Sequence, residues 1–339
     1  MIWIVLEFAL LAAIIAVAGF WLSRFGDIIA ERTGLSGSWV GLVMLATVTS
    51  LPELVTGVTA SAVLRAPDLA IGDALGSCVF NLLLFVAVDF FYRPDRMYAR
   101  ASQGHVLSAG YGSILLAVVG LNILAGPRLA ALTHAPVGAA TIVIVLVYLL
   151  AVRTIFSYER RQLMEPAEVA VERYPQATVR RAILGYAIAG ACVFSAGMML
   201  PDAALRLADA MGWSRTFVGT MFLAMATSLP ELVVTLAAVR SGALDMGVAS
   251  LLGSNLFNMM VLALDDLVYA PGPIMADASP THAATALSAV AMNAVIIVGL
   301  IYRPAGRPFG AVSWASIGLI GIYIATAWMA FAGVGSAAG

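Results

Sequence analysis

Two glutamates within long apolar segments are the residues of this sequence best suited to chemistry. Glu53 and Glu231 each follow a proline, in the heptads 49–55 and 227–233, and both heptads read Thr-Ser-Leu-Pro-Glu-Leu-Val. A charge near the centre of a bilayer costs at least about 2.5–3.5 kcal/mol on insertion scales, so such a residue is a candidate functional group. Two carboxylates brought together repel each other unless a cation or protons lie between them. The alternative is that both glutamates are protonated and structural.

The prolines before these glutamates, Pro52 and Pro230, predict a break in each helix. A proline ring removes a backbone donor and clashes with the carbonyl group four residues earlier. We expect the first helix to loosen near residues 46–50, leaving the carbonyl oxygens of that turn, Ala46 among them, free to bind a cation. The second helix should loosen near Ala226. A single copy would fit a simple proline kink equally well, whereas the repetition favours a functional site.

Hydroxyl and amide side chains accompany both glutamates. Four hydroxyl residues lie at the predicted breaks, and a Ser–Asn pair spaced four residues apart, hence on one helix face, follows each break. These residues are Thr49, Ser50, Ser77 and Asn81 in one half, and Thr227, Ser228, Ser254 and Asn258 in the other. An all-oxygen set suits a hard cation: Ca²⁺ takes six to eight oxygens, Na⁺ would accept a subset, and Mg²⁺ loses water reluctantly. A single copy would more often serve helix packing.

Asp73 breaks the repeat, because its counterpart in the second half is Ser250. It lies one turn before a Ser–Asn pair, on the same helix face. It either lines an access path for cations or marks a wet helix end. Asp89, Asp265 and Asp266 end two of the apolar segments. We expect all three mainly at the membrane interface, the last two as an outer patch that attracts cations.

The composition is that of a membrane protein. The chain is 62% hydrophobic and 11% charged, with a mean hydropathy of +0.97, whereas soluble domains carry about 25% charged residues. Cys78 and Cys192 are expected to be small buried side chains, and the three histidines to lie at wet interfaces. We predict an all-α membrane protein with ten spans, at 2–22, 38–63, 69–91, 105–125, 135–152, 182–201, 216–239, 246–268, 283–302 and 311–332.

Arginine placement predicts the orientation. All 18 basic residues are arginines, and with the N-terminus outside, 14 lie in inner connections and 4 in outer ones. The positive-inside rule therefore favours both termini outside. The polar segment 153–181 is interpreted as a cytoplasmic connector between a first half, 1–152, and a second half, 182–339. Because five spans is an odd number, the halves are inverted, a common plan of secondary transporters that bind their substrate at the midplane between repeats.

The doubled Thr-Ser-Leu-Pro-Glu, each copy followed by Gly-Ser-x-x-Phe-Asn, resembles the α-repeats of the cation/Ca²⁺ exchanger superfamily, which includes the sodium/calcium exchangers. The two α-repeats cover about residues 41–89 and 219–266. The resemblance implies ten helices in two inverted halves, ion sites between helices 2, 3, 7 and 8, and transport as helices 1 and 6 slide. It implies central Ca²⁺ ligation by the two glutamates. The carbonyl groups of Ala46 and Ala224 and the hydroxyls at the breaks would complete Ca²⁺ and Na⁺ sites, and the Ser–Asn pairs would line the same cavity.

Several positions depart from the family pattern. Prokaryotic sodium/calcium exchangers often carry an aspartate at one of the two final motif positions, whereas Asn81 and Asn258 are both amides. Cys78 replaces the usual asparagine, and Asp73 stands where the family often has one. These changes leave the central glutamates intact but bear on Na⁺ coupling.

We therefore expect an antiporter that exchanges Ca²⁺ for Na⁺ across the plasma (inner) membrane by alternating access. A Ca²⁺/H⁺ exchanger of the same superfamily is the alternative, and a non-transporting membrane scaffold or cation sensor is less favoured. No nucleophile–base pair, glycine-rich phosphate loop or redox motif indicates an enzyme. The expected partners are the lipid bilayer and small inorganic cations, with no cofactor, nucleic acid or obligate protein partner.

Overall fold

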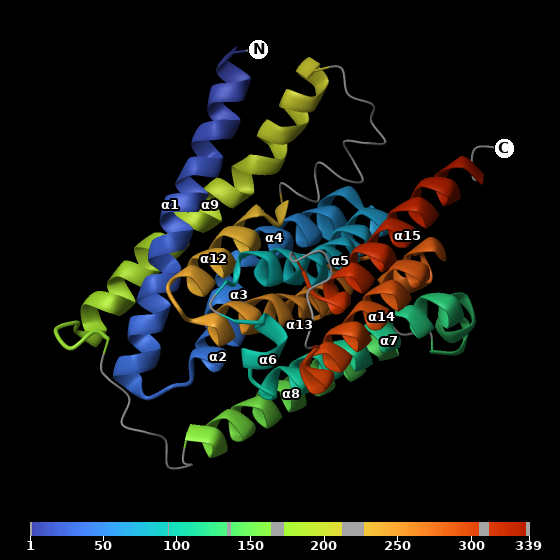
Figure 1. The fold of residues 1–339 in the computed structure, drawn as a ribbon. Coiled ribbons are helices and arrows are strands. Elements are labelled where there is room, and N and C mark those ends of the chain that lie inside the picture. Colours follow the sequence, from blue (N-terminus) through green and yellow to red (C-terminus); the bar gives the residue numbers. More distant parts are fainter. Residues whose placement is uncertain are drawn as a thin grey trace.

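The protein is built from helices. The computed structural model describes residues 2–93, 95–133, 137–163, 173–211, 227–304 and 312–336, and every regular element in these ranges is a helix (Figure 1). In chain order they are α1 (Ile2–Thr33), α2 (Gly37–Trp39), η1 (Val40–Leu45), α3 (Ala46–Thr49), α4 (Leu51–Val58), η2 (Thr59–Leu64), α5 (Pro67–Phe91), α6 (Met97–Arg100), α7 (Gly104–Thr133), α8 (Ala139–Leu163), α9 (Val179–Met211), α12 (Leu229–Arg240), α13 (Leu244–Val268), η4 (Ile274–Ala276), α14 (Thr281–Tyr302) and α15 (Trp314–Ser336).

Seven of the described helices are long and apolar enough to cross a membrane. The bent pair Gly37–Thr49 and Leu51–Leu64 makes an eighth span in the same ranges, and α15 contains a shorter apolar helix, Trp314–Met329. The first part of the predicted span 216–239 lies outside the described residues. Helices suit a bilayer because lipid offers no hydrogen-bond partner to backbone N–H and C=O groups, and a helix pairs these groups within itself.

Several predicted spans are too short. The span predicted at 2–22 continues to Thr33 as α1, and the span predicted at 135–152 overlaps α8, which begins at Ala139 and runs on to Leu163 inside the predicted connector. Hydropathy detects only the apolar part of a helix, whereas arginine and glutamate are good helix formers that extend it into water. The hydropathy pattern therefore did not predict the polar ends of these helices.

The predicted break in the first repeat is confirmed at Ser50. This residue has φ −94° and ψ 8°, separating α3 from α4, and the two parts of the span meet at 44°. Pro52 lies in the first turn of α4, where its missing N–H costs little. In the second repeat, Ser228 has nearly the same conformation (φ −88°, ψ 11°) and precedes α12, with Pro230 in its first turn. Residues 212–226 lie outside the described ranges.

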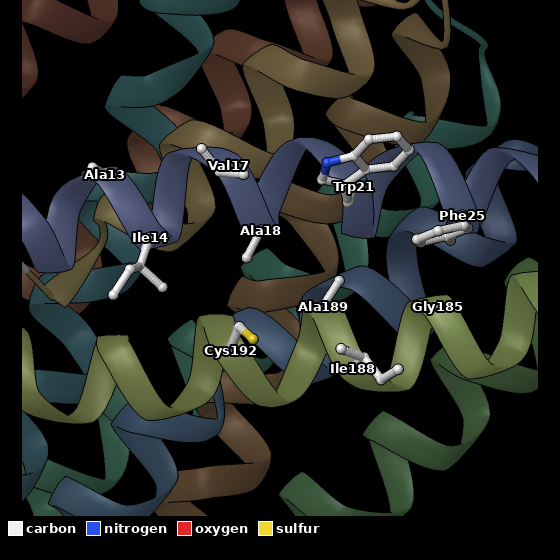
Figure 2. Close-up of a pocket in the computed structure, with 10 residues that line it drawn as sticks. All are labelled: Ala13, Ile14, Val17, Ala18, Trp21, Phe25, Gly185, Ile188, Ala189 and Cys192. Atoms are coloured by element: carbon white, nitrogen blue, oxygen red, sulfur yellow. The ribbon is translucent and has the colours of Figure 1, made fainter.

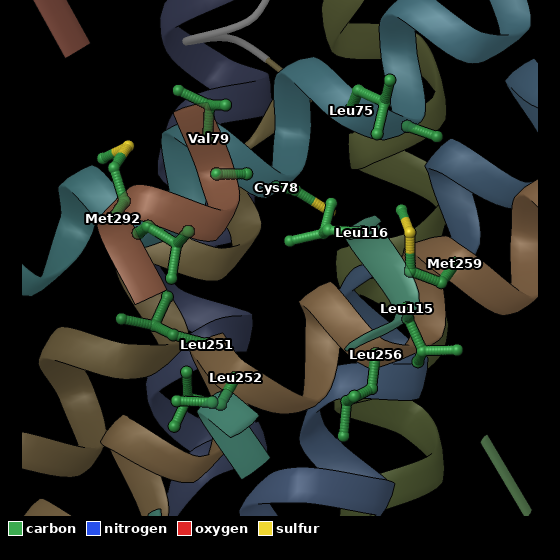
Figure 3. Close-up of a cluster of buried hydrophobic side chains, with 14 of the residues drawn as sticks. Leu75, Cys78, Val79, Leu115, Leu116, Leu251, Leu252, Leu256, Met259 and Met292 are labelled. Atoms are coloured by element: carbon green, nitrogen blue, oxygen red, sulfur yellow. The ribbon is translucent and has the colours of Figure 1, made fainter. Parts of the chain in front are cut away.

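The centre of the molecule is formed by α5 and α13. In α13, 83% of the most apolar stretch is buried, and in α5 67%, against 22% in α1. Their side chains, including Leu75, Val79 and Leu256, pack with those of α7 and α14 in one core (Figure 3). Cys78 lies in this core as expected, whereas Cys192 is exposed, so the expectation for it is wrong.

The outermost pair, α1 and α9, lies side by side (Figure 1) and packs on the broken helices. Gly19 of α1 and Gly197 of α9 occupy equivalent positions in the two repeats. A Cβ at Gly19 would meet Val233 of α12 at 2.8 Å, and one at Gly197 would meet Pro52 at 2.9 Å. Each glycine therefore allows close packing of an outer helix on a segment that carries one of the glutamates.

Two aspartates hold the halves together. Asp89, at the end of α5, accepts hydrogen bonds from Ser313 N at 2.6 Å and Ser316 Oγ at 2.7 Å, at the start of α15. Asp266, at the end of α13, accepts hydrogen bonds from Gly138 N at 2.8 Å and Thr141 Oγ1 at 2.5 Å, at the start of α8. Each carboxylate thus caps a helix of the other half.

Asp89, Asp265 and Asp266 are buried by protein and do not face water. Asp89 is 1% exposed, Asp266 1% and Asp265 0%. Their place at the ends of apolar segments suggested water, but neighbouring loops and helices of the other half cover them. The donors that satisfy two of these carboxylates come from segments far away in sequence.

A second pair of contacts repeats at the other ends of the same helices. His105 Nε2 lies 2.9 Å from Asp245 Oδ1, and His282 Nε2 lies 3.1 Å from Asp68 Oδ1. Both aspartates belong to the first turns of α13 and α5. His105 is 1% exposed, so the expectation of a wet interface fails for it. His134 lies outside the described residues.

The described part of the predicted connector contacts α1. Tyr174 donates hydrogen bonds from its hydroxyl to Asp27 (3.0 Å) and from its backbone N–H to Glu31 (2.8 Å). The guanidinium of Arg173 lies 3.4 Å from Asp27. Burial, and then the Asp27 carboxylate, raise the pKa of Tyr174, which keeps its hydroxyl a donor. Residues 164–172 lie outside the described ranges.

Candidate functional site

The two broken turns bring both glutamates into the interior. Glu53 lies in the first turn of α4 and Glu231 in the first turn of α12, and they are 3% and 1% exposed. A helix N-terminus favours a negative charge, which offsets part of the cost of burial. The two side chains are close enough to repel each other. Within the residues that the structure describes, no arginine or histidine forms an ion pair with either glutamate.

A hydrogen bond joins the two repeats at these glutamates. The hydroxyl of Ser50, at the first break, donates to Glu231 Oε1 at 3.2 Å. Oε2 of Glu231 and Oε2 of Glu53 are buried without a hydrogen-bond partner. Burying a carboxylate oxygen without a hydrogen-bond partner costs free energy, and binding a proton or a cation offsets that cost.

The other hydroxyl residues at the breaks are buried. Thr49 Oγ1 lies 3.2 Å from the carbonyl oxygens of Leu45 and Ala46 and 3.4 Å from Ser254 Oγ. Ser228 is fully buried, and its Oγ has no hydrogen-bond partner. Thr227 is 8% exposed. The Thr49–Ser254 approach therefore connects the first break to α13.

The expectation that the carbonyl group of Ala46 is left free is wrong for this conformation. It accepts hydrogen bonds from Ser50 N at 3.0 Å and from Thr49 Oγ1 at 3.2 Å. The proline instead deprives Val48 of a donor, because Pro52 has no N–H to give to the carbonyl group four residues earlier. A cation at Ala46 O would have to displace the hydroxyl of Thr49. Ala224 lies outside the described residues.

The Ser–Asn pairs are brought together by the packing of α5 on α13. Ser77, Asn81, Ser254 and Asn258 are all at most 3% exposed. Oδ1 of Asn81 and Oδ1 of Asn258 have no hydrogen-bond partner. Between these pairs the helices contact each other reciprocally: Asn255 Nδ2 donates to Cys78 O at 3.2 Å, and Cys78 Sγ lies 3.8 Å from Asn255 O.

The side chains of this site can bind a cation through oxygen atoms. Two carboxylates lie beside hydroxyl and amide oxygens, many of them buried without a partner. In the described ranges, no group of three or more His, Cys, Asp and Glu side chains is arranged to hold a metal ion. The mixed carboxylate, hydroxyl and amide oxygens of the site suit hard cations.

An apolar cavity lies away from the glutamates. It has a volume of about 620 Å³ and lies between α1 and α9, where Trp21, Phe25, Ile188 and Cys192 are among its lining residues (Figure 2). None of its lining residues is charged. The cavity offers no carboxylate or amide oxygen, so a cation finds no ligand there.

Sequence reasoning missed one acidic residue of the interior. Asp265 of α13 is fully buried, and neither of its carboxylate oxygens has a hydrogen-bond partner. Asp73, half-buried on α5, is close enough to repel Asp265, Glu53 and Glu231. A signal was present in the sequence: both aspartates break the repeat, since Val88 and Ser250 occupy the equivalent positions.

Comparison with known proteins decides the family. The family model described as "Sodium/calcium exchanger protein" matches residues 3–159 and 181–332, which is nearly the whole chain. The chain belongs to this family. It is accordingly a multi-pass membrane transporter of the cation/Ca²⁺ exchanger type and not an enzyme.

Individual exchangers and relatives agree with this assignment. The inner membrane protein YrbG of Escherichia coli is 26% identical over 284 residues, 83% of each chain. The sodium/calcium exchanger MaX1 of Methanosarcina acetivorans is 41% identical over 63 residues, 18% of each chain. The solved structure of the sodium-calcium exchanger NCX_Mj soaked with Na⁺ and Sr²⁺ superposes with a TM-score of 0.72 at 22% identity, covering 96% of this chain and 97% of the other.

Proposed function

We propose that this exchanger moves Ca²⁺ out of the cell in exchange for Na⁺, with Glu53 and Glu231 as the central ligands. The observation that carries the proposal is the glutamate pair itself. One carboxylate comes from each repeat, both are buried, and each has an oxygen without a protein partner. The hydroxyl of Ser50 donates to Glu231, and the buried hydroxyls of Thr49 and Ser228, at the two breaks, are further oxygen ligands in this proposal.

Charge neutralisation explains how such a site can exchange ions. The two glutamates carry a charge of about −2 when ionised, which one Ca²⁺ or two Na⁺ neutralise equally. A neutral site can be enclosed by protein, whereas the empty charged site pays the full cost of burying two carboxylates. Switching between the two faces of the membrane is therefore favoured when the site is loaded, which gives exchange without leak.

The proposal includes an arrangement of ten helices in two inverted halves, 1–152 and 182–339, joined by a cytoplasmic connector at 153–181. Both termini lie outside in this arrangement, because it puts 14 of the 18 arginines on the inner side. Alternation between the two sides follows from movement of α1 and α9 against the broken helices, which they touch through Gly19 and Gly197. Further ligands in the proposal are Thr227, Ser77, Asn81, Ser254, Asn258 and the carbonyl group of Ala224. The carbonyl group of Ala46 joins them once the hydroxyl of Thr49 is displaced from it.

The names of similar proteins support Na⁺ as the coupling ion. MaX1 and NCX_Mj are both described as sodium/calcium exchangers. A Ca²⁺/H⁺ exchanger is the second candidate, and one observation favours it. Asn81 and Asn258 are both neutral amides, so the described site has two central carboxylates, and two protons neutralise those as well as two Na⁺.

Proteoliposomes decide between the two coupling ions. Uptake of radioactive Ca²⁺ is measured with an outward Na⁺ gradient in one set and an outward H⁺ gradient in the other. Uptake driven by Na⁺ alone supports the proposal, and uptake driven by H⁺ alone replaces it by the second candidate. Ca²⁺ binding without uptake under either gradient would indicate a cation sensor and overturn the transport proposal.

A further inference from the structure

Asp265 is a buried carboxylate for which the protein supplies no partner. It is 0% exposed, and neither Oδ1 nor Oδ2 accepts a hydrogen bond. Its carboxylate lies against the backbone of Gly57 in α4, where a Cβ would come within 2.5 Å of Oδ2. Asp266, the next residue, has three donors on its carboxylate. A native structure satisfies its buried polar groups with few exceptions, so the missing partner of Asp265 requires an explanation.

Two polar groups share this location. Asp73, near the start of α5, is close enough for its carboxylate to repel that of Asp265, near the end of α13. Ser61 follows Gly57 by four residues, which puts it on the same side of that segment. Ser61 is fully buried, and its Oγ has no hydrogen-bond partner. In the described ranges, no arginine or histidine forms an ion pair with either aspartate.

The location is next to the central glutamates but distinct from them. Glu53 and Gly57 are one turn apart on the same face of α4, so Asp265 is displaced by about 5 Å along the helix axis. Asp73, on α5, is close enough to both Glu53 and Asp265 for its carboxylate to repel theirs. No three of these acids converge into one metal cluster among the described residues.

The acidic pair exists on one side of the molecule. The positions equivalent to Asp73, Asp265 and Gly57 in the opposite repeat are Ser250, Val88 and Thr235. Both acids, and the glycine that makes room for one of them, depart from the repeat together. The fold itself does not require them, because the other half builds the same helices without them.

We propose that Asp73 and Asp265 form a second binding site for a hard cation, adjacent to the central glutamates and on one side of the membrane only. The cation is held by the two carboxylates, with the hydroxyl of Ser61 as a further oxygen ligand. Because Asp73 is half-buried, a cation can reach the site from the surface near the start of α5. The inference rests on the proposed function only for the choice of Ca²⁺ as the ion.

Equilibrium binding of Ca²⁺ to the purified full-length protein in detergent, without Na⁺, tests this site. Glu53→Gln with Glu231→Gln removes the central ligands, and this double variant should still bind Ca²⁺. Adding Asp265→Asn to it should weaken the remaining binding about tenfold or more, and so should Asp73→Asn. Ser250→Ala, at the position equivalent to Asp73 in the other repeat, is the matched control and should leave the remaining binding unchanged.

Two results would overturn the second site. One is a double variant that elutes as a single sharp species in gel filtration and binds no Ca²⁺. The other is remaining binding that is unchanged by Asp265→Asn or by Asp73→Asn. Failure of the proposed function gives a different result. The remaining Ca²⁺ binding of the double variant would still be weakened by Asp265→Asn, but the wild-type protein would show no gradient-driven uptake in proteoliposomes.

Discussion

The hydroxyl of Ser50, in the first repeat, donates a hydrogen bond to Oε1 of Glu231, in the second, over 3.2 Å. The two residues are 181 positions apart in the chain. This contact ties the broken turn of one half to the carboxylate of the other. Any movement that separates the halves at this point must break it, so the state of the site and the arrangement of the halves are coupled.

The glutamates themselves give the first prediction. Glu53→Gln or Glu231→Gln should abolish Ca²⁺ uptake, because a neutral amide removes half of the charge that balances Ca²⁺. Uptake of radioactive Ca²⁺ into proteoliposomes measures the effect. Glu7→Gln is the control, because Glu7 forms an exposed ion pair with Arg206 and should retain uptake. Full uptake in either site variant would refute the assignment of these ligands.

Ser50→Ala should weaken Ca²⁺ binding without unfolding the protein. It removes a donor to Glu231 and an oxygen beside the cation, and a hydrogen bond to a charged group contributes about 1.5–3 kcal/mol. The expected result is at least a tenfold higher apparent Kd for Ca²⁺ in equilibrium binding. Ser50→Thr keeps the hydroxyl and should recover most of the affinity. Equal loss in both variants would show that shape, and not the hydroxyl, matters at this position.

Gly253 of α13 allows a close approach of η1. A Cβ there would collide with the backbone carbonyl group of Leu42, and a backbone atom cannot turn aside as a side chain can. Gly253→Ala should therefore destabilise the protein by more than the about 1–3 kcal/mol typical of overpacked cores. Thermal unfolding in detergent measures the change. Gly321→Ala, at an exposed position of α15, should leave the unfolding temperature nearly unchanged or raise it, because alanine favours helix.

Asp89→Ala and Asp266→Ala should each lower stability by about 1–3 kcal/mol, because they strip a cap from a helix of the other half and leave buried donors unpaired. The unfolding temperature in detergent is the measurement. Asp202→Ala, which removes an exposed ion pair with Arg206, is the control and should cost about 1 kcal/mol or less. An effect of Asp89→Ala no larger than that of the control would mean that water replaces the carboxylate.

The sequence by itself determined the local features of this exchanger. A proline removes its own N–H wherever it stands, so the break at Ser50 could be read from Pro52. Apolar length and the scarcity of charge identified the membrane helices, and the repetition of Thr-Ser-Leu-Pro-Glu identified the glutamates as paired. These properties depend on residues within one or two helical turns, which is the range that a sequence pattern describes.

Tertiary structure decided which distant groups meet. The burial of Asp89, Asp265 and Asp266, the hydrogen bond from Ser50 to Glu231, and the occupied carbonyl group of Ala46 all contradict or extend the expectations from sequence. An aspartate at the end of an apolar segment faces water or protein according to what packs beside it. That neighbour comes from the other half of the chain, and only the packing of α5 against α13 fixes where the ends of the two halves lie.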